Sequence, residues 1–352
     1  LLPAAVEPHA HLDKAFLAEV VPNPTGDLLG AIAAMTANRD RLNVAETVER
    51  GERAARLMAA NGYVAVRTHA DVTLDHGLTS IEALAEVRCR VAGLIDVEIV
   101  ALAGRPITGP EGADLRALMV DALAAGADLV GGCPHLEDFT PSGIAAATDV
   151  FLQLAADHDR AVDLHTDETL DPAANGLDVL ARQVLAGFEL PVTASHCVSL
   201  GQQAPDVQQA TAERVADAGI GVIALPHTNL FLQGRDHHPV PRGLTGVEAL
   251  RRAGVAVAAG ADNLQDPFNP VGRACPFETA GLMVLAAHDL PDAAWESVSS
   301  LAGNVVGRIP PAVAPGAPAD LLAVRASTVR EAIAFCPPER RVWRRGELVS
   351  PR

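Results

Sequence analysis

The chain has 352 residues, which is long enough to bury a large core, and this length suits one large α/β barrel with a small appendage. Aromatic residues make up only 3% of the sequence, so we expect a core of alanine and branched aliphatic side chains. The formal net charge of -17 argues against nucleic acids and anionic membranes as partners, because both repel an acidic surface. We therefore expect a small-molecule substrate.

Cysteine usage and apolar runs indicate the compartment. The five cysteines are scattered and lack C-x-x-C spacing: Cys89, Cys133, Cys197, Cys275 and Cys336. This usage is typical of a reducing compartment without a disulfide framework. The sequence has no apolar run of about 18 residues and no recognisable signal peptide. It therefore predicts a soluble, cytoplasmic protein.

Short apolar runs alternate with longer amphipathic ones along most of the chain. The predicted strands are residues 2–6, 63–68, 97–101, 129–131, 161–164, 192–195, 220–225 and 255–259. The predicted helices are residues 44–60, 113–125, 143–156, 177–185, 206–218 and 247–253. Eight strands separated by helices predict a (β/α)8 barrel of the TIM type. An open doubly wound sheet is the alternative, although the sequence has no glycine-rich phosphate-binding turn.

The pattern of alternating apolar and amphipathic runs ends at Pro310. Residues 311–316 form a linker rich in proline, and residues 319–324 and 341–349 are predicted as β-strands, the latter with a turn at Gly346. The predicted division is therefore a barrel over residues 1–310 and the strands of a small β-sandwich over residues 311–352.

A His-x-His pair, His9 and His11, follows the first predicted strand. Side chains at i and i+2 point to the same side of an extended strand, so the two imidazoles face one site. Other strand ends carry His165, His196 and Asp262. In barrels of this type the carboxyl ends of the strands meet at one rim, where the active site lies.

This set predicts a metal site. Imidazole nitrogens and one carboxylate oxygen suit one divalent ion, Zn or Fe(II), with a position left for water. The cation lowers the pKa of that water enough to give hydroxide near neutral pH. Glu168 lies three residues beyond His165 and is placed for general acid–base work.

The segments around these residues resemble the amidohydrolase superfamily, and within it the mononuclear cytosine deaminase branch. The resemblance covers nearly the whole chain. The matching segments are EPHAHLD at 7–13, VRTHAD at 66–71, PHLE at 134–137, HTDE at 165–168, LQGR at 232–235 and DNLQDP at 262–267. The resemblance implies hydrolytic deamination of a cytosine-like N-heterocycle and, by analogy, a homo-oligomer.

The resemblance also implies roles for single residues. It makes His9, His11, His165 and Asp262 the metal ligands. It makes Glu168 the proton shuttle to the ring nitrogen and His196 the residue that assists the metal-bound water, so that Glu168, His196 and Asp262 form the catalytic set. Hydrolytic deamination requires the same parts: an activated water, a base for its proton, and an acid for the ring nitrogen and the leaving amine.

The chain departs from the cytosine deaminase pattern at positions that are expected to contact the substrate. Leu102 stands in a segment that carries a Gln in cytosine deaminases, Asn263 replaces a second Asp and Phe268 replaces a Trp. Asn263, Phe268 and His135 are the candidate substrate-binding residues. Asn263, and Lys14 after the His-x-His pair, resemble a triazine-degrading relative, N-isopropylammelide amidohydrolase. The alternative reaction is therefore hydrolysis of a substituted amine or cyclic amide on a triazine-like ring.

A second alternative is a catalytically silent metal-binding subunit. Such a subunit is expected to have lost one of Glu168, His196 or Asp262, and all three are present. His135 and Glu137 form the H-x-E pair of another class of zinc deaminases, but the P-C-x-x-C segment of that class is absent.

Other polar residues have structural interpretations beside functional ones. His69, His135 and His227 are as consistent with structural or supporting histidines as with substrate contacts. His237 and His238 lie in a proline-flanked loop and are expected in solvent. Lys14 is expected to pair with an acid, and Cys197 to be a buried structural cysteine. Relatives build the small sandwich from both chain ends, so we expect this one to contain only its C-terminal half.

Overall fold

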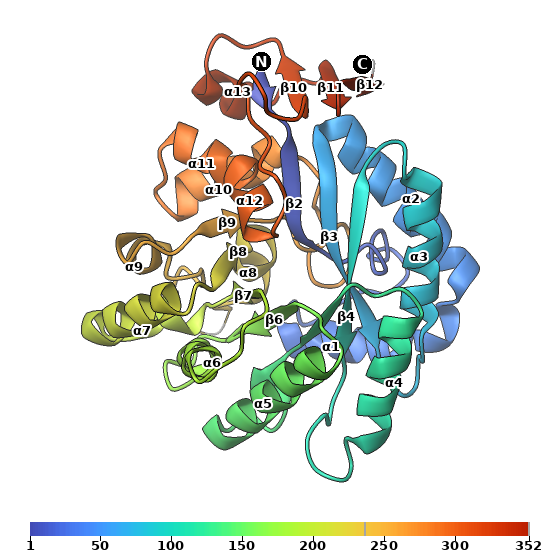
Figure 1. The fold of residues 1–352 in the computed structure, drawn as a ribbon, viewed down its shortest axis with the longest axis vertical. Coiled ribbons are helices and arrows are strands. Elements are labelled where there is room, and N and C mark those ends of the chain that lie inside the picture. Colours follow the sequence, from blue (N-terminus) through green and yellow to red (C-terminus); the bar gives the residue numbers. More distant parts are fainter. Residues whose placement is uncertain (236, 351–352) are drawn as a thin grey trace.

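The computed structural model describes residues 1–235 and 237–350. Its centre is a sheet of eight parallel strands that pair in sequence order, with helices around the outside (Figure 1). The strands are β2 (Ala5–Ala10), β3 (Tyr63–Val72), β4 (Asp96–Ala103), β5 (Leu129–Gly132), β6 (Val162–Thr166), β7 (Val192–His196), β8 (Gly221–Ala224) and β9 (Val257–Ala259). This arrangement confirms the predicted TIM-type barrel, and the open doubly wound sheet is excluded.

The barrel closes between its first and last strands. The closing contact is a single parallel bridge between Ala10 and Asp262. The Asp262 amide donates to the carbonyl of His9 at 3.0 Å, and the His11 amide donates back to the carbonyl of Asp262 at 3.2 Å. The seam of the barrel therefore runs through residues that the sequence marks as metal ligands.

Helices of different lengths connect the strands. They are α1 (Leu28–Ala37), α2 (Val44–Asn61), α3 (Thr79–Val91), α4 (Ala113–Ala124), α5 (Pro141–Asp157), α6 (Gly176–Leu185), α7 (Pro205–Asp217), α8 (Pro226–Leu232), α9 (Val247–Arg252), α10 (Pro276–Ala286), α11 (Pro291–Ser297), α12 (Ser300–Val305) and α13 (Val329–Phe335). No helix in the described part of the chain combines the length and apolar character needed to cross a membrane.

Local sequence explains where the long helices begin and end. Asn43 caps α2 by accepting a hydrogen bond from the Glu46 amide, and Gly62 ends the helix in the left-handed region at φ 114°. Thr140 caps α5 in the same way, with Pro141 in the first turn.

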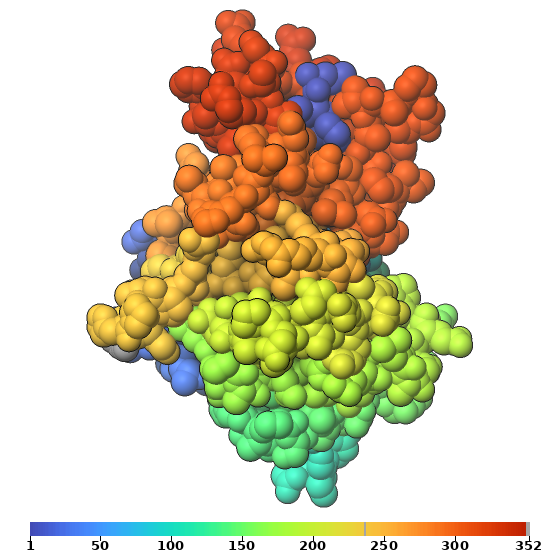
Figure 2. Space-filling view, turned by 90° about the vertical axis from the view of Figure 1, so that its left-hand side faces the viewer, coloured from blue at the N-terminus to red at the C-terminus, as the bar shows by residue number. Residues whose placement is uncertain are grey.

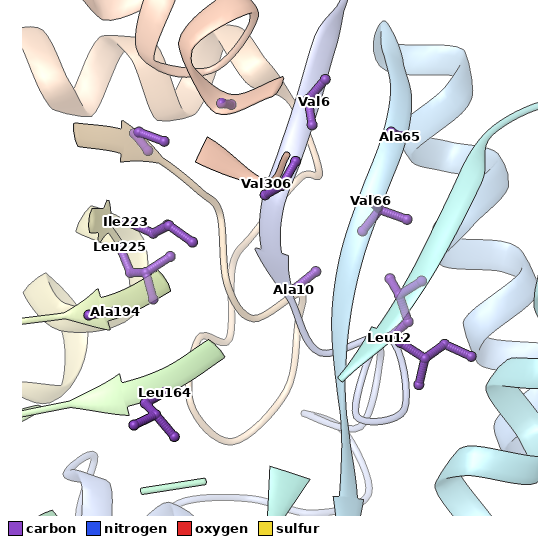
Figure 3. Packing of buried hydrophobic residues seen from close by; sticks show 14 of the residues in the cluster. Val6, Ala10, Leu12, Ala65, Val66, Leu164, Ala194, Ile223, Leu225 and Val306 are labelled. Atoms are coloured by element: carbon purple, nitrogen blue, oxygen red, sulfur yellow. The ribbon is translucent and has the colours of Figure 1, made fainter. Parts of the chain in front are cut away.

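The core consists of small and branched aliphatic side chains, as the low aromatic content predicts. Figure 3 shows side chains of this kind on several strands, among them Val6, Ala65, Leu164, Ala194 and Ile223, all of which are buried. Strand residues that are buried on both faces are typical of a parallel sheet covered by helices. The barrel is therefore a rigid support for the side chains at its rim.

A second sheet of four antiparallel strands lies at one end of the molecule, where both termini meet (Figures 1 and 2). Its strands are β1 (Leu2–Pro3), β10 (Leu321–Val324), β11 (Arg340–Arg344) and β12 (Glu347–Ser350). Figure 2 shows the N-terminal residues lying among the C-terminal segment. The small sheet thus includes an N-terminal strand as well as the C-terminal ones.

One strand prediction needs correction. The predicted strand 2–6 is split, because residues 2–3 pair with β10 and the chain enters the barrel only at Ala5. The turn predicted within residues 341–349 is present between β11 and β12, where Arg345 and Gly346 have φ angles of 51° and 85°. Two consecutive positive φ angles are typical of a tight hairpin turn.

Candidate active site

The carboxyl ends of the barrel strands bring the predicted site residues together. His9 lies in β2 and His11 just beyond it, His165 lies in β6, His196 ends β7, and Asp262 follows β9. All five side chains are buried, with 6% or less of their surface exposed. Residues that are up to 253 positions apart in the sequence therefore share one enclosed space.

Distances within this group are short enough for ligands of one ion. Oδ1 of Asp262 lies 3.3 Å from Nε2 of His11 and 3.5 Å from Nε2 of His9. Nε2 of His11 lies 3.2 Å from Nε2 of His165. Three sets of candidate ligand atoms share His9, and the atoms of each set lie within 4.8 Å of one another. The partners of His9 are His11 and Asp262 in one set, His165 and His196 in another, and His69 and Asp163 in the third.

Several of these polar atoms have no hydrogen-bond partner within residues 1–235 and 237–350. They are both ring nitrogens of His9, Nδ1 of His165, Nε2 of His196, and both carboxylate oxygens of Asp262. Buried polar atoms are costly when they are unpaired, so such a cluster is typical of a ligand site. A divalent cation fits this donor set of imidazole nitrogens and carboxylate oxygen.

Burial sets the protonation states of the group. Burial, together with the charge of nearby Asp266, raises the pKa of Asp262 to about 8. Burial likewise lowers the pKa values of His9, His11 and His165 well below the usual range. Neutral imidazoles are the form that binds metal, and a buried carboxylate without a donor needs a cation beside it.

Glu168 lies next to this group, on the turn after β6. Its Oε1 is 3.5 Å from Nδ1 of His196, and its backbone carbonyl accepts a hydrogen bond from Gln233 at 3.3 Å. Burial raises the pKa of Glu168 well above its usual range, and the charge of Asp262 adds to the shift. A carboxyl group held in its protonated form can donate a proton near neutral pH.

The backbone at the rim is strained at three positions. Asp167, His196 and Asp262 have φ angles of 50°, 67° and 63°, in the left-handed region that disfavours residues with side chains. The Asp167 carboxylate accepts hydrogen bonds from the amides of Gly176 and Leu177, both at 2.9 Å, which anchors the turn that carries Glu168.

His196 is held by two further contacts. The side-chain amide of Asn229, on α8, lies 2.9 Å from Nδ1 of His196. The Thr245 hydroxyl donates to the His196 carbonyl. Because Nδ1 is occupied by Asn229, the free nitrogen of the ring is Nε2, which faces Oδ2 of Asp262 at 3.9 Å.

A cavity of about 470 Å³ opens above the cluster. Its walls are largely apolar and include Leu28, Ile32 and Met35 of α1, together with Leu102, Gly104 and Phe268. A second cavity of about 680 Å³ shares Leu28, Leu136 and Glu168 with the first. The site thus has room for a flat ring and space beyond it.

The candidate substrate-binding residues lie in different places. Phe268 and Asn263 line the first cavity. The amide of Asn263 is engaged by its neighbours, because its Oδ1 accepts from Thr228 at 3.2 Å and its Nδ2 donates to Asp266 at 2.8 Å. His135 lines the second cavity, and its Nδ1 lies 3.2 Å from the carbonyl of His165.

The remaining singled-out residues take mostly structural positions. Lys14 pairs with Asp71 at 2.7 Å, as predicted, and its Nζ also lies 3.1 Å from Nδ1 of His11. Cys197 is buried, also as predicted. His237 and His238 are exposed.

The histidines His69 and His227 divide between the cluster and the periphery. The His69 ring is tilted against the ring of His9 with centroids 4.0 Å apart, so His69 lies directly beside the candidate ligands. Nε2 of His227 lies 3.2 Å from the Thr279 hydroxyl of α10. His227 is therefore a packing residue between helices.

Three features of the site were not predicted. Glu7 accepts hydrogen bonds from the amides of Ala261 and His9 at 3.0 and 3.3 Å, and so ties the two sides of the barrel seam together. Asn229 and helix α1 were also missed. The sequence carries one signal for the role of Glu7. This residue lies two residues before His9, and so on the same face of the strand.

Comparison with known proteins adds to this geometry. A model of the amidohydrolase family matches residues 24–350. Pterin deaminase of Rhizobium rhizogenes (strain K84) is 33% identical over 357 residues, which cover 99% of this chain and 80% of that protein. The structure of 5-methylcytosine deaminase from Klebsiella pneumoniae with 5-fluorocytosine has a TM-score of 0.91 at 31% identity, covering 100% of this chain and 86% of that one. N-isopropylammelide isopropylaminohydrolase from Burkholderia multivorans has a TM-score of 0.83 at 31% identity, covering 99% and 86%.

Proposed function

Because the chain belongs to the amidohydrolase family, we propose that it hydrolyses the carbon–nitrogen bond of an amino-substituted N-heterocycle and releases ammonia. The match to the family model confirms the resemblance to amidohydrolases that the sequence motifs indicated. The observation that carries the proposal is the buried cluster of His9, His11, His165 and Asp262, whose polar atoms are largely unpaired in the described part of the chain. Glu168 and His196 lie beside this cluster.

We propose that His9, His11, His165 and Asp262 hold one divalent cation, Zn²⁺ or Fe²⁺. The support is the donor set itself, which is three imidazoles that burial keeps neutral and one carboxylate that needs a positive neighbour. A cation bound there would lower the pKa of a water ligand toward neutrality.

The protein groups would move the protons. Asp262 directs Oδ1 toward His9 and His11, which leaves Oδ2, facing His196, to accept the proton of the attacking water. His196 would orient that water through Nε2. Glu168 would donate a proton to the ring nitrogen beside the amine-bearing carbon, and the amine would leave after it is protonated. The raised pKa of Glu168 supports the acid role.

We propose a cytosine-like substrate edge, meaning an amine on a ring carbon next to a ring nitrogen. Cytosine and pterin both carry this edge, and deaminases named for 5-methylcytosine and pterin are both similar to the chain. The two adjoining cavities favour a ring with space for a second ring or a substituent. Phe268 and Leu102 would contact the faces and edge of the ring.

The alternative is removal of a substituted amine from a triazine-like ring. Asn263 after Asp262, and the similar solved structure from Burkholderia multivorans, favour this reaction. The two reactions differ in their products, because deamination releases ammonia and the alternative releases an alkylamine.

The test is a substrate panel assayed on protein whose metal content has been measured. The panel contains aminopyrimidines, pterins, aminotriazines with and without N-alkyl groups, and cyclic amides, with ammonia and alkylamine measured separately. We expect ammonia from a cytosine-like or pterin-like compound. Alkylamine release alone would support the triazine alternative, and no turnover by metal-loaded protein would support the silent-subunit alternative.

A further inference from the structure

We propose that Cys275 and Cys336 form an oxidisable dithiol, which a hydroperoxide converts into a disulfide that links the loop after β9 to helix α13. The pair lies outside the proposed active site and does not depend on the proposed function. Its Sγ atoms are 3.4 Å apart, although the residues are 61 positions apart in sequence. Cys275 immediately precedes α10, Cys336 ends α13, and these two helices pack against each other.

An arginine is fixed against both sulfurs. Nη2 of Arg340 lies 3.2 Å from Sγ of Cys275 and 3.3 Å from Sγ of Cys336. Its other nitrogens donate to the carbonyls of Asn61 at 2.7 Å and Pro337 at 3.0 Å, so the guanidinium cannot turn away easily. A fixed positive charge stabilises a thiolate and repels a metal cation, which favours redox chemistry over metal binding.

The two thiols have different roles. The thiol of Cys336 and the guanidinium of Arg340 lower the pKa of Cys275 to about 5, although burial opposes this. Cys336, which is partly exposed, is held as the protonated hydrogen-bond donor. Cys133 and Cys197 contrast with this pair, because burial raises the pKa values of both. A low-pKa thiolate beside a second thiol is the arrangement in which sulfenic acid is resolved to a disulfide.

The chemistry balances with a hydroperoxide as the oxidant. The Cys275 thiolate attacks one peroxide oxygen, the O–O bond breaks, and the products are a sulfenic acid and hydroxide, or alkoxide from an alkyl hydroperoxide. The Cys336 thiol then attacks the sulfenic sulfur, forms the S–S bond and releases water. The two sulfurs together lose two electrons, which reduce the peroxide.

The disulfide would join two parts of the molecule with different tasks. Cys275 ends the loop that follows β9, residues 260–275, which carries Asp262, Asn263 and Phe268. The side chain of Asn61 already donates to the carbonyls of residues 273 and 274 in this loop at 3.2 and 2.9 Å. A covalent bond here would restrain the C-terminal end of the loop against α13 and reduce the freedom of the unfolded chain.

The main test is peptide mapping of the whole protein after treatment with hydrogen peroxide, without reduction. We expect a cross-linked peptide pair that contains Cys275 and Cys336 and has lost two hydrogen atoms. The melting temperature should rise by about 2 °C or more and return after reduction. Cys89→Ser is the matched control, because Cys89 is exposed and far from Arg340 in the sequence, and this variant should cross-link as the wild type does.

Two variants test the separate roles. In Cys336→Ser, peroxide should leave a sulfenic acid at Cys275 that dimedone traps. In Arg340→Met, alkylation of Cys275 at pH 6 should slow by about tenfold or more, since the thiolate loses its cation. The proposal is overturned if peroxide oxidises Cys89 while Cys275 and Cys336 of the wild type stay reduced, or if Cys275 yields no dimedone adduct in folded Cys336→Ser. Mapping of the wild type decides the matter if either variant fails to fold.

Discussion

Two layers of side chains fill the barrel interior two residues apart along the same strands. The lower layer contains Glu7, Arg67 and Asp163, and the upper layer contains His9, His69 and His165 in the matching positions. In the lower layer Arg67 donates to Asp163, and Glu7 accepts from backbone amides. One carboxylate oxygen of Glu7 and one of Asp163 have no partner in the described residues. In the upper layer the rings lie against each other, with centroids of His9 and His165 4.6 Å apart, and several of their nitrogens have no partner within the described chain.

Arg67, in the lower layer, uses each of its guanidinium nitrogens in a hydrogen bond. Its Nε donates to Glu98 at 2.6 Å and its Nη1 to Asp163 at 2.9 Å. Its Nη2 donates to the carbonyl of Val306 at 3.0 Å. His69, in the upper layer, lies with Nε2 3.7 Å from Oδ1 of Asp163 below it and with its ring tilted against that of His9. The comparison teaches that the lower layer contains its own cation, Arg67, paired with Asp163, whereas the unpaired nitrogens of the upper layer are available to a ligand.

The largest effect is expected from a substitution of Glu168, the acid beside the upper layer. We expect Glu168→Gln to lower kcat by about 10³- to 10⁴-fold, because an amide has no acidic proton for the ring nitrogen. The metal content, measured by elemental analysis, should stay at the wild-type value. Full activity of the variant would contradict the shuttle role, and loss of metal would make Glu168 a ligand instead.

A change in the lower layer should act on stability rather than chemistry. Arg67→Met keeps much of the side-chain length but leaves Asp163 buried without its cation. We expect the free energy of unfolding of metal-free protein to fall by roughly 3–5 kcal/mol, as measured by urea denaturation. Arg56→Met is the matched control, since Arg56 is half exposed and forms a surface pair with Glu52, and its effect should be within about 1 kcal/mol.

The stability of the metal-free protein should depend on pH through Asp262, which lies beside the upper layer. Burial raises the pKa of Asp262 to about 8 from a usual value near 4, so the folded state holds a proton that the unfolded state releases. The resulting stability is fully present below about pH 4 and is lost as the pH rises through about 8.

We expect Asp262→Asn to remove this contribution. The free energy of unfolding of the metal-free variant should therefore fall less steeply than that of the wild type between pH 5 and pH 8. Thermal unfolding at several pH values, in buffer with a chelator, measures the difference. Parallel pH curves for the two proteins would show that Asp262 already has a stabilising partner in the fold.

The smallest expected effect concerns the cavity wall. Leu102→Gln adds an amide to the segment in which, by the resemblance, cytosine deaminases carry a Gln, so it should favour a ring with a matching polar edge. We expect the ratio of kcat/KM between cytosine and pterin to change by about tenfold in favour of cytosine. Leu102→Met, which keeps an apolar side chain of similar volume, is the control and should leave the ratio nearly unchanged.

The barrel and the cluster were predictable because each depends on a local pattern. Short buried strands end in His165, His196 and Asp262, and parallel strands deliver such residues to one rim. Helix α1 was not predictable in the same way. Its sequence is apolar without a clear stripe, and only Ala31 and Met35 of its side chains are buried, because it covers a cavity and not the core.

Side-chain contacts that depend on how distant strands and helices align could not be predicted from the sequence either. Asn229 meets His196, and Arg67 meets Asp163, only because the strands and helices align as they do in the closed barrel. The split of the first predicted strand has the same origin. Leu2–Pro3 finds its partner more than 300 residues later in the sequence, and no local signal announces that pairing.

The seam between β2 and β9 has a consequence for folding. Asp262 donates a backbone hydrogen bond to His9 and accepts one from His11 across the bridge that closes the barrel, so the site is complete only when the last strand has docked on the first. Because this contact joins residues about 250 positions apart in the sequence, we expect it to form late and slowly during folding. A cation added to refolding chains would therefore bind only those whose barrel has closed. The rate of metal uptake would then report the rate of barrel closure.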